Sequence, residues 1–438
     1  MYKKILLLFL LITSTYAKNM MSVDDLLDLQ KTKHQNTKEI EVKNILNGGT
    51  FVFVKKNRHL YKEGLIYNGW TRKEYLKNPK VLRLEWFLHS PPGKSGEPNK
   101  ELTLDHTKAL VTLFKNIDHG MTVYIPNGVF YSTKELSCAG KHYVTFQGEG
   151  YALQQNSSYA SNSRLQYRGT KKNATFIDAG KHPTFMNIAI WGNGCSKSWK
   201  YNHLQNPHGT IGLKIEGSLN AINLQLKYHR VGLYFWKDSY YTRTNSLEIK
   251  YTDLALSYKQ TPYNQKFFGA IFQETNQIWD RSGRSLSFIG CSFEHYSKQN
   301  VILPGTKVNF NNCYFETSQK IETFLRLEKR ASLTVRDSMV YTKNSRFFLD
   351  NSNGYYSVFI SENNTIVNDQ NILSTYTKLS PDDKGQMVKM YGDILEFDYP
   401  KMSHYVNIKP VQNNTDIIFP KGCEIYLDNG EKLEKETR

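Results

Sequence analysis

The sequence contains short segments in which apolar residues alternate with polar ones, and several of these segments match one another. Residues 286–294 (LSFIGCSFE) and 308–316 (VNFNNCYFE) match position for position at an offset of 22 residues (313 − 291), and 333–341 follows at an offset of 25 (338 − 313). The segment 247–254 fits the same frame, with Ile249 at the position of Phe288 and a longer insert at about 259–284 before the next copy. Looser copies occupy 222–226 and 186–190. A period in the low twenties without helices is typical of a solenoid whose rungs are short strands.

In such a solenoid, equivalent side chains lie above one another at the spacing of parallel strands, about 4.8 Å. We therefore predict that Cys291, Cys313 and Ser338 form one inward-facing ladder. An antiparallel sandwich would also contain short alternating strands, but it gives no reason for successive units to keep the same register. The repeats thus favour the solenoid.

One amphipathic helix is predicted at 105–117, where apolar residues recur at 109, 110, 113, 114 and 117. Asp105 or Thr107 can cap its start, and Gly120 stands where a left-handed stop is expected. Strands are predicted directly after it, at 122–126 and 129–131. Upstream, 22–29 reads as a short helix, and 49–70 reads as a hairpin of two strand-like runs around a polar turn.

The helix and the strands after it resemble the N-terminal signature of the pectate-lyase-like superfamily of right-handed β-helices. The resemblance rests on Asp105-x-Thr107-x-Ala109-Leu110 followed by 123–130 (VYIPNGVF). The segments 48–53 and 65–72 are similar to the lead-in hairpin of bacteriophage tailspikes within that superfamily, and the Cys-x-Phe-Glu rungs are similar to its coils. The loop 90–99 lacks the glycine-acidic run, ending in paired aspartates, that is common in relatives.

The resemblance covers roughly 50–370 and implies an all-β fold: a right-handed parallel β-helix with an N-terminal capping helix. The helix would cover the first coil, whose strand edges and apolar core would otherwise be exposed. The superfamily includes lyases, hydrolases, epimerases and non-catalytic binding members, so the resemblance is specific for the fold and weak for the reaction.

The sequence divides into four segments: a signal peptide at 1–17, a lead-in segment at 18–100, the β-helix with its capping helix at 101–370, and a β-rich C-terminal cap or accessory region at 371–438. Residues 1–17 combine Lys3 and Lys4, an apolar run from 5 to 12, and a small residue, Ala17. This order predicts a cleavable secretory signal and a secreted or periplasmic protein, although a buried N-terminal helix is the alternative. The sequence has no later apolar stretch of membrane-spanning length, so we expect no membrane insertion.

Charge and composition narrow the class of partner. Lys and Arg outnumber Asp and Glu by 57 to 40, which gives a net charge of +17 and favours a polyanionic partner. Aromatic residues make up 13% of the chain and supply flat surfaces for sugars or bases. Predicted export and the lack of a known basic-aromatic motif argue against nucleic acid, so an acidic polysaccharide is the expected partner. The assembly is left open as a monomer or a trimer.

No cofactor or metal site is predicted. The five cysteines have neither CxxC nor zinc spacing, and we read most of them as small buried residues; they are Cys138, Cys195, Cys291, Cys313 and Cys423. Ca²⁺, which some uronate lyases of this shape require, lacks the support of an acidic cluster. Gly-rich phosphate loops, HExxH, GxSxG and EF-hand motifs are likewise absent from the sequence.

The first candidate for chemistry is the pair Glu294 and Glu316. With one coil between them, these residues would project from the same face about 5 Å apart. Retaining glycosidases place a nucleophile and an acid/base carboxylate at that separation. The alternative is an ordinary outward-facing Glu that hydrogen-bonds the adjoining turn.

The second candidate is the run Lys227-Tyr228-His229-Arg230 at the end of an alternating strand. β-Elimination of a uronate needs a base for the proton next to the carboxylate and cations for the charge that develops there. Lys227 or His229 would act as base, Arg230 as carboxylate clamp, and Tyr228 as proton donor in contact with substrate. The alternative is a basic turn on a basic protein.

The third candidate is the segment 273–284 of the insert between two rungs, interpreted as a loop that walls the binding face. Trp279 would stack on a sugar, Arg281 and Arg284 would bind carboxylates or sulfates, and Glu274 would contact substrate. A second insert, Cys195 to Pro207 followed by His208, carries Trp199, Tyr201 and His203 and would do the same. A packed surface loop is the alternative in both places.

The resulting hypothesis is an exported enzyme that degrades an acidic, uronate-containing polysaccharide. β-Elimination ranks first because of the charge balance. A retaining glycoside hydrolase that uses Glu294 and Glu316 is the second enzymatic option. The third option is a non-catalytic glycan-binding or adhesion protein with a lyase-like fold.

Overall fold

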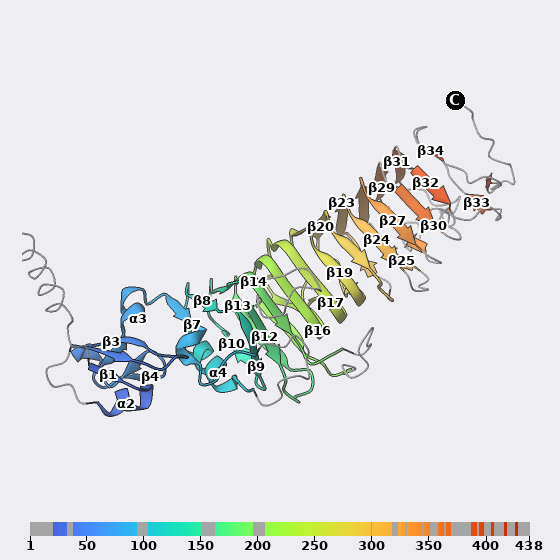
Figure 1. Cartoon of the computed structure of the whole chain (residues 1–438). Coiled ribbons are helices and arrows are strands. Elements are labelled where there is room, and N and C mark those ends of the chain that lie inside the picture. The colour runs from blue at the N-terminus through green and yellow to red at the C-terminus, as the bar shows by residue number, and fades with distance from the viewer. Residues whose placement is uncertain are drawn as a thin grey trace, which may run out of the picture.

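The computed structural model shows an elongated β-solenoid preceded by a small separate sheet (Figure 1). It describes residues 21–32, 38–93, 104–150, 163–195, 206–298, 300–317, 323–328, 331–342, 346–350, 358–362, 365–368, 387–391, 394–397, 404–406, 416–417 and 425–427. The predicted signal peptide at 1–17 lies outside the described residues. None of the helices in these ranges is long and apolar enough to cross a membrane.

The N-terminal sheet has six strands in the order β1-β2-β3-β6-β5-β4. Their bounds are β1 (Met21–Val23), β2 (Glu39–Val42), β3 (Gly49–Phe53), β4 (Tyr61–Lys62), β5 (Ile66–Tyr67) and β6 (Trp70–Arg72). Helices α2 (Leu26–Lys31) and α3 (Lys73–Lys77) and the 3-10 turn η1 (Lys55–Asn57) accompany it. β3 pairs antiparallel with β6, which confirms the predicted hairpin within 49–70.

The solenoid has three faces of parallel strands, and each rung of the chain passes through faces A, B and C in turn. Three long strands bend across the faces: β14 (Thr184–Trp191) across A and B, and β16 (Asn220–Lys237) and β17 (Arg243–Tyr258) across all three. β19 (Ile271–Trp279) crosses B and C.

The shorter strands each belong to one face. Face A also contains β7 (Val81–Arg83), β8 (Thr122–Ile125), β11 (Thr145–Gly148), β18 (Gln265–Phe268), β20 (Ser285–Ile289), β23 (Lys307–Asn311), β26 (Ser332–Arg336), β29 (Val358–Glu362) and β31 (Met387–Tyr391). Face B also contains β9 (Gly128–Ser132), β12 (Ser163–Tyr167), β21 (Ser292–Glu294), β24 (Tyr314–Thr317), β27 (Met339–Thr342), β30 (Thr365–Asn368), β32 (Ile394–Phe397) and β34 (Asp416–Ile417). Face C also contains β10 (Leu136–Ser137), β13 (Thr175–Lys181), β15 (Ile211–Glu216), β22 (Asn300–Ile302), β25 (Thr323–Leu327) and β28 (Arg346–Asp350), and β33 (His404–Val406) pairs with β35 (Ile425–Leu427).

The interior is built from ladders of equivalent residues. Phe267, Phe288 and Phe310 lie in register on face A, with stacked ring centroids 5.1 and 5.2 Å apart. Cys291 and Cys313 occupy adjacent rungs: the amide of Tyr314 donates to the Cys291 carbonyl at 2.8 Å. The amide of Cys313 donates to Ser338 Oγ at 3.0 Å, and all three ladder residues are buried. The predicted ladder is confirmed.

Helix α4 (Thr107–Asn116) closes the N-terminal end of the solenoid together with the 3-10 turn η2 (Leu84–Phe87). The Asp105 carboxylate accepts from the Thr107 amide at 2.8 Å, and Gly120 has φ +66°, as predicted. Phe114 of the helix stacks on Phe146 of the first rungs at 5.6 Å. The helix therefore joins the core instead of lying on the surface, which agrees with its expected capping role.

Two sequence interpretations differ from the strand pairing. The presumed insert at 259–284 is a full rung, since β18 and β19 pair in register with β17 before them and with β20 and β21 after them. Parallel pairing also continues past residue 370, because β31 and β32 stack on β29 and β30.

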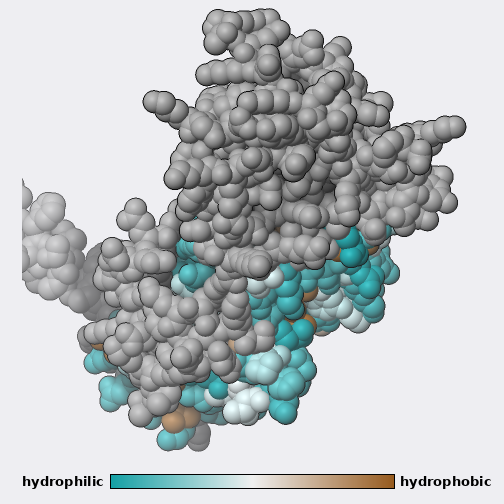
Figure 2. All heavy atoms as spheres, turned by 90° about the vertical axis from the view of Figure 1, so that its right-hand side faces the viewer, coloured by the Kyte–Doolittle hydropathy of each residue, from teal (hydrophilic) through white to brown (hydrophobic). Residues whose placement is uncertain are grey.

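The described surface seen from the C-terminal end is mainly hydrophilic (Figure 2).

Candidate functional site

The corner between faces B and C carries one residue per rung in a left-handed conformation: Tyr228, Tyr251, Glu274 and His295, with φ between +50° and +59°. The corner between faces A and B uses the same conformation, but mostly with residue types that tolerate it, namely Asn187, Asn223, Ser246, Gly269, Gly290, Asn312 and Asp337. A bulky residue held this way costs roughly 1–3 kcal/mol, and such strain clusters at functional sites. The B/C corner is therefore a candidate functional region.

Glu294 and Glu316 lie next to this corner, on the outer side of face B. They pair in register on adjacent strands β21 and β24, which places them one rung, about 4.8 Å, apart. Both side chains are half-buried, and the residues that precede them, Phe293 and Phe315, point into the core. The predicted juxtaposition of the two carboxylates on one face is confirmed.

Neighbouring side chains orient both carboxylates. Gln273 Nε2 donates to Glu294 Oε2 at 2.8 Å, and Ser292 Oγ donates to Glu294 Oε1 at 2.5 Å. Tyr314 donates its hydroxyl to Glu316 Oε2 at 2.9 Å. Burial raises the pKa of Tyr314 to about 12, and the charges of Glu316 and Glu294 add to this. The phenol therefore keeps its proton and remains a hydrogen-bond donor at neutral pH.

Sequence reasoning missed Gln273, Ser292 and Tyr314. The signal was present, because Ser292 and Tyr314 precede the two glutamates by two residues and so point to the same side of the strand. Gln273 could not be found in the same way, since its rung had been interpreted as a loop.

Glu274 adds a third carboxylate at the corner, one rung before His295. It is half-buried, and no hydrogen-bond donor among the described residues reaches its buried Oε2 atom. A buried carboxylate oxygen without a donor is unfavourable by about 1–3 kcal/mol or more, which a ligand hydroxyl could recover. Glu274 comes from a strand and not from a loop, and its contact with substrate stays a prediction.

The earlier rungs of face B carry a buried ionic cluster. The Glu248 carboxylate lies 2.8 Å from Lys250 Nζ and 3.6 Å from Lys227 Nζ, and it accepts from Gln225 Nε2 at 2.5 Å. Burial raises the pKa of Glu248, but the two ammonium groups outweigh that effect and keep the pKa below its usual range. Burial lowers the pKa of Lys227, and Glu248 partly opposes the change. The cluster is a set of paired charges beside the accessible carboxylates.

The run 227–230 is not one catalytic group. Lys227 belongs to the ionic cluster, Tyr228 is buried and stacks on Tyr251 at 4.9 Å, and Arg230 is half-buried with its amide bonded to the Thr210 carbonyl. His229 points into the core and has no exposed surface. Its ring nitrogens bond Thr210 Oγ1 at 2.8 Å and the Ile190 carbonyl at 3.0 Å. The expected role of His229 as a base acting on substrate is wrong because substrate cannot reach it.

The expected binding loop at 273–284 is also corrected. Trp279 is fully buried, donates Nε1–H to the Val301 carbonyl at 2.8 Å and stacks on Phe288 at 5.7 Å, so it cannot be a sugar platform. Arg281 and Arg284 are exposed at the corner between faces C and A, away from the carboxylates on face B. They do not belong to this site.

His208 is exposed before β15, with its amide donating to Asn206 Oδ1 at 3.0 Å. Trp199, Tyr201 and His203 lie outside the described residues. Across the described ranges, His, Cys, Asp and Glu form no group of three that could hold a metal ion. Cys138, Cys195, Cys291 and Cys313 are buried, and Cys423 lies outside the described part of the chain.

Solved structures with the same arrangement of rungs include several phage proteins. The tailspike protein gp49 from Acinetobacter baumannii bacteriophage Fri1, a capsular polysaccharide depolymerase, is 13% identical, with 95% of this chain and 77% of that chain covered and a TM-score of 0.57. The gp42 tailspike of Acinetobacter phage vb_AbaP_AS12 is 12% identical, with coverages of 95% and 76% and a TM-score of 0.52. This chain has the tailspike type of parallel β-helix.

A third tailspike shows how much of such proteins the chain spans. It covers 64% of the enzymatically active domain of bacteriophage CBA120 tailspike protein 2, with 96% of this chain aligned, 14% identity and a TM-score of 0.50. The chain thus spans less than two thirds of that domain. No protein-family model matches the sequence, and no curated protein matches it. At these identities the similarity establishes the fold alone.

Proposed function

We propose that this protein acts on a polysaccharide along face B and hydrolyses it with Glu294 and Glu316. The observation that carries the proposal is the in-register pairing of the two glutamates on adjacent rungs, beside a strained corner. A separation near 5 Å suits a retaining mechanism. The tailspike type of fold, which includes a capsular polysaccharide depolymerase, supports a glycan as substrate.

The hydrogen bonds suggest how the roles divide. Glu294 accepts from two neighbouring donors, which stabilise its negative charge and favour it as the nucleophile that attacks the anomeric carbon. Glu316 would protonate the departing glycosidic oxygen and then remove a proton from the water that hydrolyses the glycosyl-enzyme. Glu274 would hold a sugar hydroxyl next to the reaction.

Hydrolysis now ranks above β-elimination. The proposed base His229 is enclosed in the core, and Lys227 and Lys250 are engaged by Glu248. We retain an acidic polysaccharide as the substrate class because of the net charge of +17. Export to a secreted or periplasmic location and a monomeric or trimeric assembly stay predictions.

The test is an assay of the purified protein against a panel of acidic and neutral polysaccharides, read by reducing ends and by absorbance of unsaturated uronate. Hydrolysis predicts new reducing ends without the absorbance band, and anomeric configuration retained in the first product. Glu294→Gln and Glu316→Gln should each lower the rate by at least about 10²-fold. Glu216→Gln, which alters an ion pair with Lys237 on face C, is the matched control and should keep full activity.

A non-catalytic glycan-binding protein is the second candidate, because Glu294 and Glu316 both have ordinary hydrogen-bond partners within the protein. That function predicts saturable binding to one polysaccharide without any new ends. An absorbance band of unsaturated product would instead contradict both candidates and restore the elimination hypothesis.

A further inference from the structure

The corner between faces C and A carries two columns of residues that run along the solenoid axis. Residues near the start of the face A strands pair rung by rung, from Thr122 through Thr145, Thr184, Asn220, Arg243 and Lys266 to Ser287. The first column consists of the residues three positions before these: His119, His142, Lys181, Gly217, Tyr240, Tyr263 and Arg284. The second column consists of the residues two positions before them: Gly120, Tyr143, His182, Ser218, Tyr241, Asn264 and Ser285. We call these fourteen residues the C/A stripe.

Direct contacts link neighbouring rungs of the C/A stripe on both sides of the step from Ser218 to Tyr241. His142 pairs with Lys181 and Tyr240 with Tyr263 in parallel bridges. The Tyr240 and Tyr263 rings stack at 5.4 Å, and Arg284 lies 4.6 Å over the Tyr263 ring. The stripe crosses seven rungs, so its six steps of about 4.8 Å give a length of about 29 Å.

The aromatic rings of the stripe are exposed. Tyr143, Tyr240 and Tyr241 have 65%, 43% and 70% of their surface accessible, and they are among the most exposed large apolar side chains of the described chain. Tyr143 stacks on His182 at 5.2 Å, whereas its other neighbour in the column is Gly120, which has no side chain. A Cβ atom on Gly120 would meet no atom of the described residues within 4 Å. One face of Tyr143 is therefore open to a ligand.

Two of these tyrosines are also strained. Tyr143 and Tyr241 have φ of +58° and +52°, a conformation that is uncommon for bulky residues and favourable for Gly or Asn. An exposed Tyr at such a position contributes little to packing, so folding alone gives no reason for it. A role in binding explains why Tyr143 and Tyr241 occupy these two positions, whereas Gly120 and Asn264 occupy the same column on other rungs.

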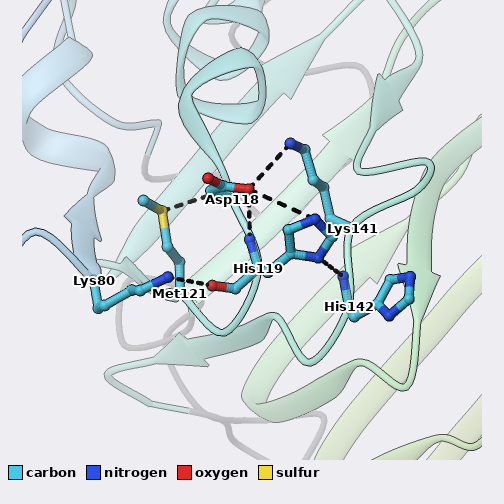
Figure 3. A network of polar contacts seen from close by, with 6 residues as sticks. All are labelled: Lys80, Asp118, His119, Met121, Lys141 and His142. Atoms are coloured by element: carbon cyan, nitrogen blue, oxygen red, sulfur yellow. Dashed lines mark hydrogen bonds and ion pairs between the residues drawn. The ribbon is translucent and has the colours of Figure 1, made fainter.

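The charge around the stripe is positive. Exposed cations beside it are Lys80, Arg243, Lys266 and Arg281, and Lys141 is half-buried. Of the nearby acids, Asp118 bonds Lys141 Nζ at 3.2 Å and Glu216 lies 3.2 Å from Lys237 Nζ, while Asp238 is exposed. At the N-terminal end the charged groups form a fixed network, in which Lys80 Nζ donates to the His119 carbonyl at 2.7 Å and the His142 amide donates to His119 Nδ1 at 3.1 Å (Figure 3).

From these observations we infer that the C/A stripe is a second binding surface, for an acidic polysaccharide that lies along the solenoid axis. Open tyrosine faces stack on sugar rings, and the cations bind carboxylate, sulfate or phosphate groups on the same chain. The stripe lies at the corner opposite face B and is independent of Glu294 and Glu316. Its function is to hold a polymer on the protein, whether or not the polymer is cut.

A polysaccharide fits this surface better than a single-stranded nucleic acid does. Nucleic-acid channels stack successive bases on successive aromatic rings. Here Tyr240 and Tyr263 already stack on each other, and Tyr143 on His182, so successive rungs do not each offer a free ring face. Isolated open faces with intervening hydroxyl groups, as on Ser218 and Ser285, suit a chain that hydrogen-bonds at every residue.

The experiment is affinity electrophoresis of the full chain in gels that contain polygalacturonate, heparin or neutral dextran, with a fluorescent oligothymidylate tested in parallel by a mobility shift. The Tyr143→Asn/Tyr241→Asn double variant removes both open rings and keeps a residue that accepts the left-handed conformation. Arg284→Glu reverses the charge at the far end. Tyr61→Asn, an exposed tyrosine of the N-terminal sheet, and Lys62→Glu are matched controls.

We expect at least one acidic polysaccharide to retard the native chain, and salt to diminish this retardation. Binding should be at least about fivefold weaker in the double variant and in Arg284→Glu, and unchanged in both controls. Adding the stripe substitutions to Glu294→Gln should weaken its retardation by the same factor as in the native chain, which separates the stripe from the site on face B. Any of four results would overturn the proposal. The stripe variants bind as the native chain does; no acidic polymer retards the chain; dextran binds equally well and independently of salt; or oligothymidylate binds more strongly than the acidic polysaccharides. Circular dichroism and thermal unfolding check that each variant is folded.

Discussion

The enclosed histidine makes the stability of the solenoid depend on pH in a way that can be calculated. Burial lowers the pKa of His229 from its usual 6.5 to about 4, and the hydrogen bond to the Ile190 carbonyl opposes this only in part. In the unfolded chain the imidazole takes up a proton below about pH 6.5. Between pH 6.5 and 4 the unfolded state therefore binds one more proton than the folded state.

The sign and size of the effect follow from this difference. The contribution of His229 to the free energy of unfolding is complete above pH 6.5 and falls as the pH is lowered toward 4. At about 1.36 kcal/mol for each pH unit between the two pKa values, the loss is about 3 kcal/mol. Other groups titrate in the same range, so the measurement must be a difference between two chains.

The comparison is between the native chain and His229→Gln, whose amide can still bond Thr210 and the Ile190 carbonyl. Urea unfolding, followed by circular dichroism, gives the free energy of unfolding from pH 4 to 7.5. At pH 7 the variant should be less stable, and the gap should narrow by about 3 kcal/mol at pH 4. His208→Gln, at an exposed histidine, is the control. A gap that stays constant with pH would refute the enclosed position of His229.

Two further predictions concern the interior and the ionic cluster. Phe288→Ala removes a ring stacked between Phe267 and Phe310 and should lower the free energy of unfolding by about 3–5 kcal/mol; a loss below 1 kcal/mol by the same urea assay would contradict the ladder. Glu248→Ala leaves two buried ammonium groups without their shared carboxylate and should also lower it by about 3–5 kcal/mol. Glu216→Ala, at a partly exposed ion pair, should change the free energy of unfolding by less than about 1 kcal/mol. Equal losses in Glu248→Ala and Glu216→Ala would count against burial of the cluster.

The fold was predictable from the sequence because equal side chains meet on successive rungs. Cys291 and Cys313 could be placed on adjacent rungs since both copies keep the same residues between the same two apolar positions. The copy at 247–254 was aligned incorrectly, with Ile249 matched to Phe288, whereas the register links Ile249 through Phe272 to Phe293. An alternating pattern reads the same on faces A and B, so it cannot say on which face a segment lies.

The candidate site was only partly predictable for a related reason. A left-handed residue at each corner interrupts the alternation, so that Lys227 points outward, Tyr228 makes the bend, and His229 points inward. Sequence periodicity cannot locate that interruption, because nothing about Tyr228 indicates a left-handed φ. Glu294 and Glu316 were placed correctly because no bend separates either of them from the repeated phenylalanines.

The rung is also a unit of variation. Phe267 and Phe288 occupy equivalent positions 21 residues apart in the sequence (288 − 267), and Phe288 meets a phenylalanine on each side, Phe267 and Phe310. A gene could gain or lose such a unit without altering the contacts on either side of it. Duplication of one rung would move every later rung along the solenoid axis by about one strand spacing, 4.8 Å. It would also rotate those later rungs by the twist between adjacent strands. The length of the solenoid can thus change in whole rungs while the packing within each rung stays the same.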